Sequence, residues 1–178
     1  MKWLVIITVA VVALLLWRMS AFANRNLPKA GDTAPIFTLP DQNGRTRSLV
    51  EFRGRWVVLY FFPKADTPGL TEQAARFRDA MQEIEAFGAM VCGVSVDSSD
   101  RLAQFAARYG LPFVLLSDRD GAVARRYGSL IDLGLLKFAR RNTFLIDPQG
   151  RVVKVYLKVE PAHNADDVIA GIKEMNRA

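Results

Sequence analysis

The hydrophobic positions of this chain change their spacing repeatedly, and each change marks an expected strand or helix. Continuous apolar runs at 56–62 and 90–96 are typical of strands that are buried on both faces. Between these runs, apolar side chains recur every three or four residues from Leu70 to Phe87, which predicts one amphipathic helix. Other strands are expected at 36–39, 46–50, 113–116, 143–146 and 152–157, and other helices at 98–109, 122–127 and 166–176.

This order of elements predicts the fold class. Strands that alternate with helices predict an α/β domain with a mainly parallel central sheet and flanking helices. The runs at 143–146 and 152–157 are separated only by a turn, so they are expected to form an antiparallel hairpin. Residues 31–178 are expected to form this domain, and residues 24–30 a polar linker before it.

The connection at 128–141 is unusually apolar for a loop. One short turn cannot bury all of its apolar residues, so part of the run is expected to be exposed. It is either a covering loop beneath the domain or a surface that faces a bilayer or an integral-membrane partner. The apolar residues are Leu130, Ile131, Leu133, Leu135, Leu136 and Phe138, and the basic residues beside them are Lys137, Arg140 and Arg141.

The N-terminal segment 1–23 is set apart by a second apolar run. Residues 3–17 are apolar except for Thr8, with Lys2 before them and Arg18 after them. As a helix this run is about 22 Å long, which is short for a hydrocarbon core of ~30 Å, although interfacial Trp and flanking bases shorten the distance to be crossed. It is expected to be an uncleaved hydrophobic membrane anchor. The alternative is a signal peptide that is cleaved after the small-x-small stretch at 21–23.

Both alternatives take the domain to a membrane, and the order of Lys2 and apolar run favours export to the periplasmic or another extracytoplasmic side. The formal net charge is +6, but the basic residues are spread widely and no nucleic-acid motif accompanies them. Nucleic acid is therefore not an expected partner. Membrane lipid is expected, together with an integral-membrane or membrane-associated protein.

The chain has one cysteine and one histidine, and these counts limit its chemistry. Cys92 alone allows no internal disulfide, no Cys-x-x-Cys motif and no zinc-finger spacing. His163 alone excludes a histidine-cluster metal site, and its place just before a helix indicates a structural role. No metal and no cofactor is expected.

The site is expected beyond the carboxyl ends of the strands, which places it at the loop 63–70 and near Asp97 and Ser98. The expected helix begins in this loop, and a helix N-terminus lowers the pKa of a thiol placed there. Residues 63–71 resemble the active-site loop of peroxiredoxins, the alkyl hydroperoxide reductase/thiol-specific antioxidant family, and most closely its bacterioferritin-comigratory branch. The family pattern Pro-x-x-x-Thr-x-x-Cys is matched at Pro63 and Thr67.

The resemblance extends over the chain from about Pro28. Residues 31–40 resemble the family's opening segment, and 53–63 its strand before the site. Residues 141–147 resemble the segment that carries the catalytic arginine, which falls on Arg141. The resemblance implies a thioredoxin-like fold and descent from thiol peroxidases.

Two departures from the family pattern concern its sulfur atoms. Leu70 stands where the resemblance places the peroxidatic cysteine, and Ala75 where it places a resolving cysteine. Cys92 falls within a buried strand, before the site and on the other side of the sheet, where a thiol is usually inert. Thr67 and Arg141 are expected to keep structural roles, as a turn residue and as the partner of a carboxylate; the alternative is that they still bind a small anion or a partner group.

Three functions follow from these patterns. The leading hypothesis is a membrane-tethered, catalytically inactive protein that acts as an accessory, docking or structural module, such as a subunit of a membrane complex. The alternative is a thiol peroxidase that uses Cys92 or a partner's thiol. The third is a ligand-binding domain that uses Thr67 and Arg141. The first is preferred because it explains the absence of both family cysteines without a further assumption.

Overall fold

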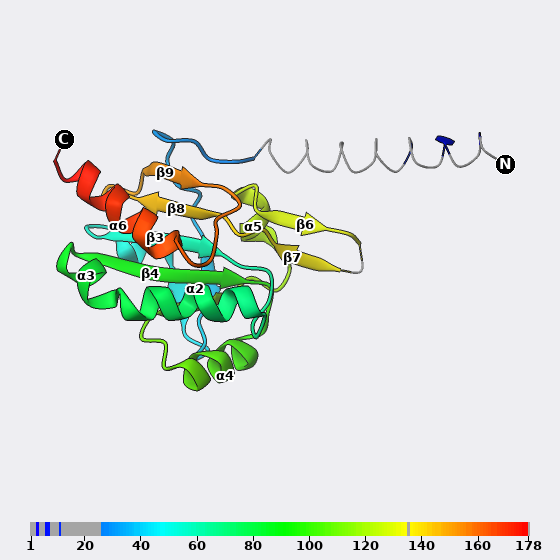
Figure 1. Cartoon of the computed structure of the whole chain (residues 1–178), viewed down its shortest axis with the longest axis horizontal. Coiled ribbons are helices and arrows are strands. Elements are labelled where there is room, and N and C mark those ends of the chain that lie inside the picture. The colour runs from blue at the N-terminus through cyan, green and yellow to red at the C-terminus, as the bar shows by residue number, and fades with distance from the viewer. Residues whose placement is uncertain (1–2, 4–5, 8–10, 12–25, 135, 178) are drawn as a thin grey trace.

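A five-stranded sheet lies at the centre of the computed structural model, which describes residues 3, 6, 7, 11, 26–134 and 136–177 (Figure 1). The spatial order is β5-β4-β3-β8-β9. The bounds are Trp56–Phe61 for β3, Ala89–Ser95 for β4, Val114–Ser117 for β5, Thr143–Ile146 for β8 and Val152–Tyr156 for β9.

The sheet is mixed, which corrects the expectation of a mainly parallel one. β3, β4 and β5 are parallel, whereas β8 runs antiparallel to β3 and β9 antiparallel to β8. The helix after β5, α5 (Ala122–Arg126), is too short to carry the chain back across the sheet, as a parallel connection requires. The chain therefore enters β8 from the end where β5 finished. The expected antiparallel hairpin of the last two strands is confirmed.

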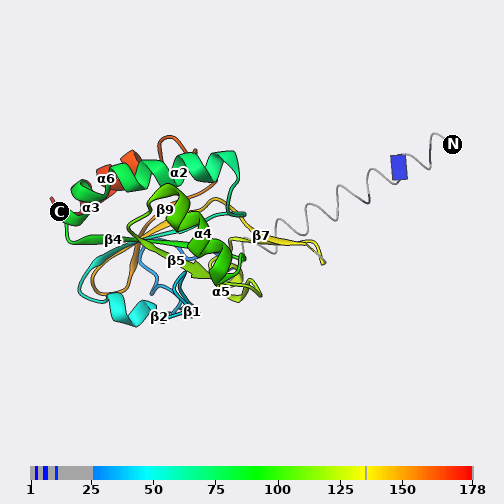
Figure 2. The same cartoon turned by 90° about the horizontal axis from the view of Figure 1, so that it is seen from below.

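Two apolar cores cover the two faces of the sheet, and β3 contributes to both (Figure 2). Val58 and Tyr60 belong to the first cluster, and Val57, Leu59 and Phe61 to the second. Over the first cluster lie α2 (Pro68–Asp79), α3 (Met81–Ala86), α4 (Ser99–Tyr109) and α6 (Asn164–Met175). Over the second lie α5, the short 3-10 helix Leu49–Phe52 and the antiparallel hairpin β1 (Thr38–Pro40) and β2 (Thr46–Ser48).

The prediction of a single helix from Leu70 to Phe87 is wrong. The chain instead forms α2 and α3, which meet at Ala80, where φ is −89° and ψ is −2°. Phe77 in α2 and Ile84 in α3 are both fully buried in the first cluster. Apolar residues keep helical spacing across the break, so the pattern alone does not show it.

Other expectations are met closely. The hairpin of β1 and β2 forms, and Ser98 caps α4 through a hydrogen bond from the Arg101 N–H to its Oγ. β8 has the expected bounds, and α6 begins at Asn164, two residues before the expected start. His163 is the N-cap residue of α6, and its Nδ1 lies 3.3 Å from Oε2 of Glu160.

The connection at 128–141 is not a loop but a third hairpin, β6 (Leu130–Asp132) and β7 (Lys137–Ala139) (Figure 1). Leu130 and Ala139 face each other across the hairpin and are buried in the second cluster. Leu133 and Leu136 are 50% and 60% exposed. The covering alternative holds for the base of this segment, which packs on the domain, and the expected exposure is found at its tip. Leu135 lies outside the described residues.

Most of the expected anchor or signal segment 1–23 also lies outside the described residues. No helix in the described part is long and apolar enough to span a membrane. In the expected linker, Leu27 packs against the second core cluster, so the packed domain includes it.

Gly93 in β4 marks a close approach of the Tyr60 ring, and we expect Gly93→Ala to destabilise the domain. A Cβ atom at this position would lie 2.7 Å from Cζ and Oη of Tyr60 and 2.8 Å from Cδ2 of Leu115. Tyr60 cannot move freely, because it stacks on Phe77 at a centroid distance of 5.1 Å. The expected loss in unfolding free energy is about 2 kcal/mol, measured by urea denaturation.

The control is the same change in a Tyr60→Phe background. The loss should be smaller there, because the hydroxyl oxygen is one of the atoms closest to the added carbon. An unchanged denaturation midpoint for Gly93→Ala would contradict this account of the packing.

Candidate functional site

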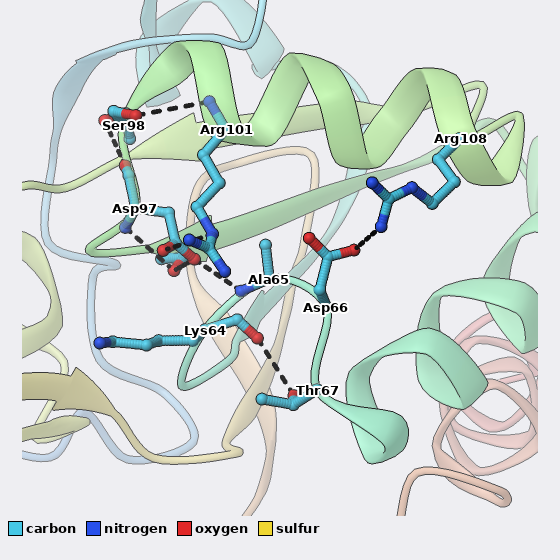
Figure 3. A network of polar contacts seen from close by, with 10 residues as sticks. Lys64, Ala65, Asp66, Thr67, Asp97, Ser98, Arg101 and Arg108 are labelled. Atoms are coloured by element: carbon cyan, nitrogen blue, oxygen red, sulfur yellow. Dashed lines mark hydrogen bonds and ion pairs between the residues drawn. The ribbon is translucent and has the colours of Figure 1, made fainter.

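The loop at 62–67 joins β3 to α2 at the carboxyl end of the strand, where the sequence placed the site. Asp97, just after β4, holds this loop in place (Figure 3). Its Oδ2 accepts hydrogen bonds from the Ala65 N–H at 2.6 Å and from Ser95 Oγ at 2.8 Å. Arg101 Nε lies 3.6 Å from the other carboxylate oxygen and offsets its buried charge. The ends of β3 and β4 are thereby linked.

Contacts within and beside the loop set its shape. Asp66 has a φ of +61°, a left-handed conformation that Asp tolerates better than most residues. Its carboxylate pairs with Arg108 of α4 at 3.0 Å (Figure 3). Thr67 Oγ1 donates a hydrogen bond to the Lys64 carbonyl at 3.1 Å. This contact gives Thr67 the turn-holding role that was one of its two expected alternatives.

Leu70 is in the first turn of α2 and its side chain is completely buried. Its N–H donates to the Thr67 carbonyl at 2.9 Å, so the backbone here has the geometry of a helix start. The side chain belongs to the first core cluster. A hydrocarbon at this position has no lone pair with which to attack a peroxide, so the first turn of α2 positions a core residue.

Arg141 reaches the same turn from the segment before β8. Its Nη2 lies 2.9 Å from the point where a Cβ of residue 69 would be, so the guanidinium packs against the Gly69 backbone. Burial lowers the pKa of this guanidinium. The expected pairing with a carboxylate is absent among the described residues, and Nη1 is buried without a hydrogen-bond partner there. Arg141 therefore lies against the turn that also contains Thr67 and Leu70.

A buried polar cluster beside this turn was missed at the sequence level. Gln73 Nε2 donates to Asn164 Oδ1 at 2.8 Å, and Thr143 Oγ1 donates to the same oxygen at 2.9 Å. All three residues are fully buried and join α2, β8 and α6. The available signal was Gln73 on the apolar face of a helix. Ala75 follows on α2, half-buried, at the expected resolving position.

A cleft of about 410 Å³ lies on the other side of the loop and was also missed. It is bordered by the site loop, the residues after β4 and β5, and the tip of the β6–β7 hairpin. The sequence could not bring these four segments together. The lining residues are Lys64, Val96, Asp97, Ser98, Arg119, Gly134, Leu136 and Lys137.

Cys92 lies in a different part of the core from the first turn of α2. It lies in the middle of β4, between Leu59 of β3 and Val114 of β5, and is fully buried in the second core cluster. Leu70 is in the first cluster, so the sheet separates the two residues. Burial raises the pKa of the Cys92 thiol to about 12. Such a thiol is protonated at neutral pH and is a weak nucleophile. Within the described residues, no group of three His, Cys, Asp or Glu could hold a metal ion.

Comparisons with known proteins agree with the resemblance. Residues 30–155 match the model of the AhpC/TSA family. The chain is 41% identical over 145 residues to a putative peroxiredoxin bcp of Coxiella burnetii, covering 79% of this chain and 96% of that one. It is 39% identical over 150 residues to peroxiredoxin Bcp of Escherichia coli, covering 82% and 96%.

A solved structure supports the same fold. The crystal structure of peroxidoxin BcpB from Mycobacterium tuberculosis superposes with a TM-score of 0.80 at 36% identity, over 83% of this chain and 98% of that one. The expected thioredoxin-like α/β fold is therefore confirmed, with a mixed sheet in place of a mainly parallel one.

We expect Cys92 to be inert in the folded protein. With maleimide at pH 7, native protein should remain unlabelled and denatured protein should take up one equivalent. Raising the pH to 9 should change little, because a thiol of pKa about 12 stays protonated there.

The positive control is Glu72→Cys in a Cys92→Ser background, since Glu72 is exposed on α2. Labelling of native wild-type protein at the rate of this control would show that the buried environment of Cys92 is wrong. Intact mass of native and of denatured samples measures the labelling of the wild type and of the control.

Proposed function

The chain belongs to the AhpC/TSA peroxiredoxin family, in its Bcp/PrxQ branch, and from this premise we propose that it does not itself reduce peroxides. Its role is that of a membrane-tethered accessory or docking module, which partners a membrane-associated or integral-membrane protein. The observation that carries the proposal is the position of the one cysteine: Cys92 is buried in the second core cluster, on the face of the sheet opposite to Leu70 in the first turn of α2.

The chemistry of peroxide reduction supports this proposal. A thiolate attacks one peroxide oxygen, the O–O bond breaks, and an alcohol or water leaves. The sulfur becomes a sulfenic acid, which further thiols then reduce by two electrons. Leu70 offers no such sulfur, and the Thr67 and Thr71 hydroxyls cannot be oxidised and regenerated in this way. Ala75 likewise offers no resolving thiol.

Membrane tethering rests on the sequence of the first 23 residues. The apolar run 3–17 between Lys2 and Arg18 is the feature that supports it. A tether of this kind holds the domain near a surface, where a binding role needs only modest affinity for a partner.

A second candidate function is thiol-dependent peroxide reduction through Cys92 or through a thiol supplied by a partner. The names of the relatives favour it, since the two bacterial proteins compared above, 41% and 39% identical to this chain, are named peroxiredoxins. The retained juxtaposition of Thr67 and Arg141 at the start of α2 is also compatible with it.

A peroxide assay separates the two functions. Purified protein with dithiothreitol, and separately with thioredoxin, should consume hydrogen peroxide no faster than buffer. Turnover that is present in the wild type and absent in Cys92→Ser would establish the second candidate and end the proposal.

Restoring the sulfur is the companion test. If the first turn of α2 keeps the family's geometry, Leu70→Cys in a Cys92→Ser background should regain some reaction with peroxide, because a helix start lowers the pKa of a thiol and the shorter side chain leaves open part of the space that leucine fills. If the thiol's pKa falls from about 8.5 to about 6, the thiolate fraction at pH 7 rises about 30-fold over that of a free thiol. Leu70→Ser in the same background is the matched control and should stay inactive. An inactive, folded Leu70→Cys variant would show that Thr67 and Arg141 no longer provide the family's geometry.

The tether has its own prediction. The full chain should fractionate with membranes and resist extraction by high salt, because the apolar run is held by hydrophobic transfer rather than by charge. Removal of residues 1–23 should leave a folded domain that high salt releases from the membrane fraction. Intact mass of the membrane fraction tests the cleaved-signal alternative, and a mature form that begins at residue 24 and is found only in the soluble fraction would refute the tether.

A further inference from the structure

The tip of the β6–β7 hairpin holds two leucine side chains away from the domain. Leu133 and Leu136 are 50% and 60% exposed and belong to neither core cluster. The turn between them is closed by a hydrogen bond from the Leu133 N–H to the Leu136 carbonyl at 2.8 Å. The Gly134 N–H donates to Asp132 Oδ1 at 3.0 Å. Neither of these two hydrogen bonds involves a leucine side chain.

The base of the hairpin is anchored, so the tip has a defined direction. Leu130 and Ala139 are paired across the strands and buried in the second core cluster. Asp132 pairs with Arg125 of α5 at 3.0 Å. In both views the hairpin extends beyond the end of the central sheet (Figures 1 and 2). The base of the hairpin is fixed on the domain and its tip is apolar and exposed. The tip is therefore placed to insert its leucine side chains into an apolar environment, and it does not cover the core.

Three cations border the cleft beside this tip. Lys64 comes from the site loop, Arg119 from the segment after β5 and Lys137 from the hairpin itself, while Leu136 belongs to both cleft and tip. In the part of the chain that the structure describes, Lys64 and Arg119 form no ion pair. Asp97 also borders the cleft, but its carboxylate is occupied by the Ala65 N–H and Arg101.

The charge of Lys137 is partly compensated, and its Nζ also donates a hydrogen bond to the Asp120 carbonyl at 3.4 Å. Its Nζ lies 3.9 Å from Asp132, whose carboxylate has its closer contact with Arg125 at 3.0 Å. The cleft therefore presents an excess of positive charge directly beside exposed leucine. A bilayer of anionic phospholipids presents phosphates directly beside hydrocarbon, so this juxtaposition fits such a surface.

We propose that the tip and the basic cleft together dock the domain on a bilayer that contains anionic phospholipids. Leu133 and Leu136 enter the boundary between head groups and acyl chains, and Lys64, Arg119 and Lys137 contact the head-group phosphates. This inference rests on the docking role proposed above and names the surface that performs it. The surface acts in addition to the N-terminal tether and includes none of its residues.

In this assignment, two of the cations that were expected beside the apolar run, Arg140 and Arg141, are not part of the docking surface. Arg141 packs on Gly69 at the start of α2, and Arg140 is at the base of the hairpin, where its N–H donates to the Ser129 carbonyl at 2.7 Å. Lys64 and Arg119 take their place at the tip. They are distant from the hairpin in the sequence, so only the folded chain brings them there.

The test uses residues 26–178, which lack the apolar run. This part holds every strand of the central sheet and both core clusters. The match to the solved relative from Mycobacterium tuberculosis covers 83% of this chain and 98% of that one. Circular dichroism and a thermal melt check the folding of each variant.

The experiment is sedimentation with sucrose-loaded vesicles of phosphatidylcholine alone, or with 30% phosphatidylglycerol (about physiological anionic content). The domain should bind the anionic vesicles, bind neutral ones at least about tenfold less, and be released as salt is raised. Leu133→Ser/Leu136→Ser, and separately Lys64→Gln/Arg119→Gln/Lys137→Gln, should each weaken binding by about tenfold or more.

Matched controls exist elsewhere on the surface. Ile36→Ser/Val50→Ser removes two apolar side chains of the same exposure, 60% and 48%. Arg53→Gln/Arg55→Gln/Arg151→Gln removes three exposed cations near the other end of β3. Both controls should bind like the wild type.

Equal loss in the controls, equal binding to neutral and anionic vesicles, or no binding to either would overturn the proposal. Binding to native membranes but not to protein-free vesicles would replace lipid by a membrane protein as the partner, and would also overturn it. None of these outcomes alters the peroxide assay, so this surface and the absence of peroxidase activity can fail separately.

Discussion

Strand β3 is buried on both faces and paired on both edges, and the rest of the domain is arranged around it. Its residues from Val57 to Phe61 are at most 2% exposed. Successive side chains point into different core clusters, so a shift of one residue in register would exchange the contents of the two cores. This constraint also places the loop at 62–67, because the chain leaves β3 beside the end of β4. Asp97 then joins the two strand ends through its bond to the Ala65 N–H.

Packing and reactivity make opposite demands at the start of α2. A side chain that reacts with a peroxide must be reachable, whereas Leu70 is fully buried in the first core cluster. Complete burial of a leucine side chain contributes about 1.5–3 kcal/mol relative to an exposed one. Under the proposed function, the position has changed from chemistry to core packing. Thr67 and Arg141 also have structural contacts, to the Lys64 carbonyl and to Gly69, so their presence does not require a reaction.

The short helix α5 has consequences for both the sheet and the surface. With only five residues it cannot return the chain to the start of the sheet, so β8 runs antiparallel to β3. The chain instead turns through the β6–β7 hairpin at the end of the sheet where the site loop and Asp97 also lie. The site loop, the basic cleft and the exposed leucines therefore lie at one end of the domain. The proposed contact with a bilayer is made by this end of the domain.

Much of this protein was determined by the sequence alone. The buried strands, the cap at Ser98, the α/β class and the location of the site loop follow from side-chain period and turn residues, which act over a few neighbours. The resemblance at Pro63, Thr67 and Arg141 indicated the candidate site, and in the structure Arg141 packs against Gly69, in the turn that follows Thr67.

Other features depended on contacts between segments far apart in the chain. The break at Ala80, the mixed sheet and the pairing of β6 with β7 are outcomes of packing against distant elements, which periodicity does not record. The buried bond between Gln73 and Asn164 spans 91 positions. The cleft that joins Lys64, Arg119 and Lys137 likewise needs three segments at once. Local pattern determines which residues are buried and in what element, and only the tertiary fold decides which side chains meet, because meeting depends on chain direction and on the whole core.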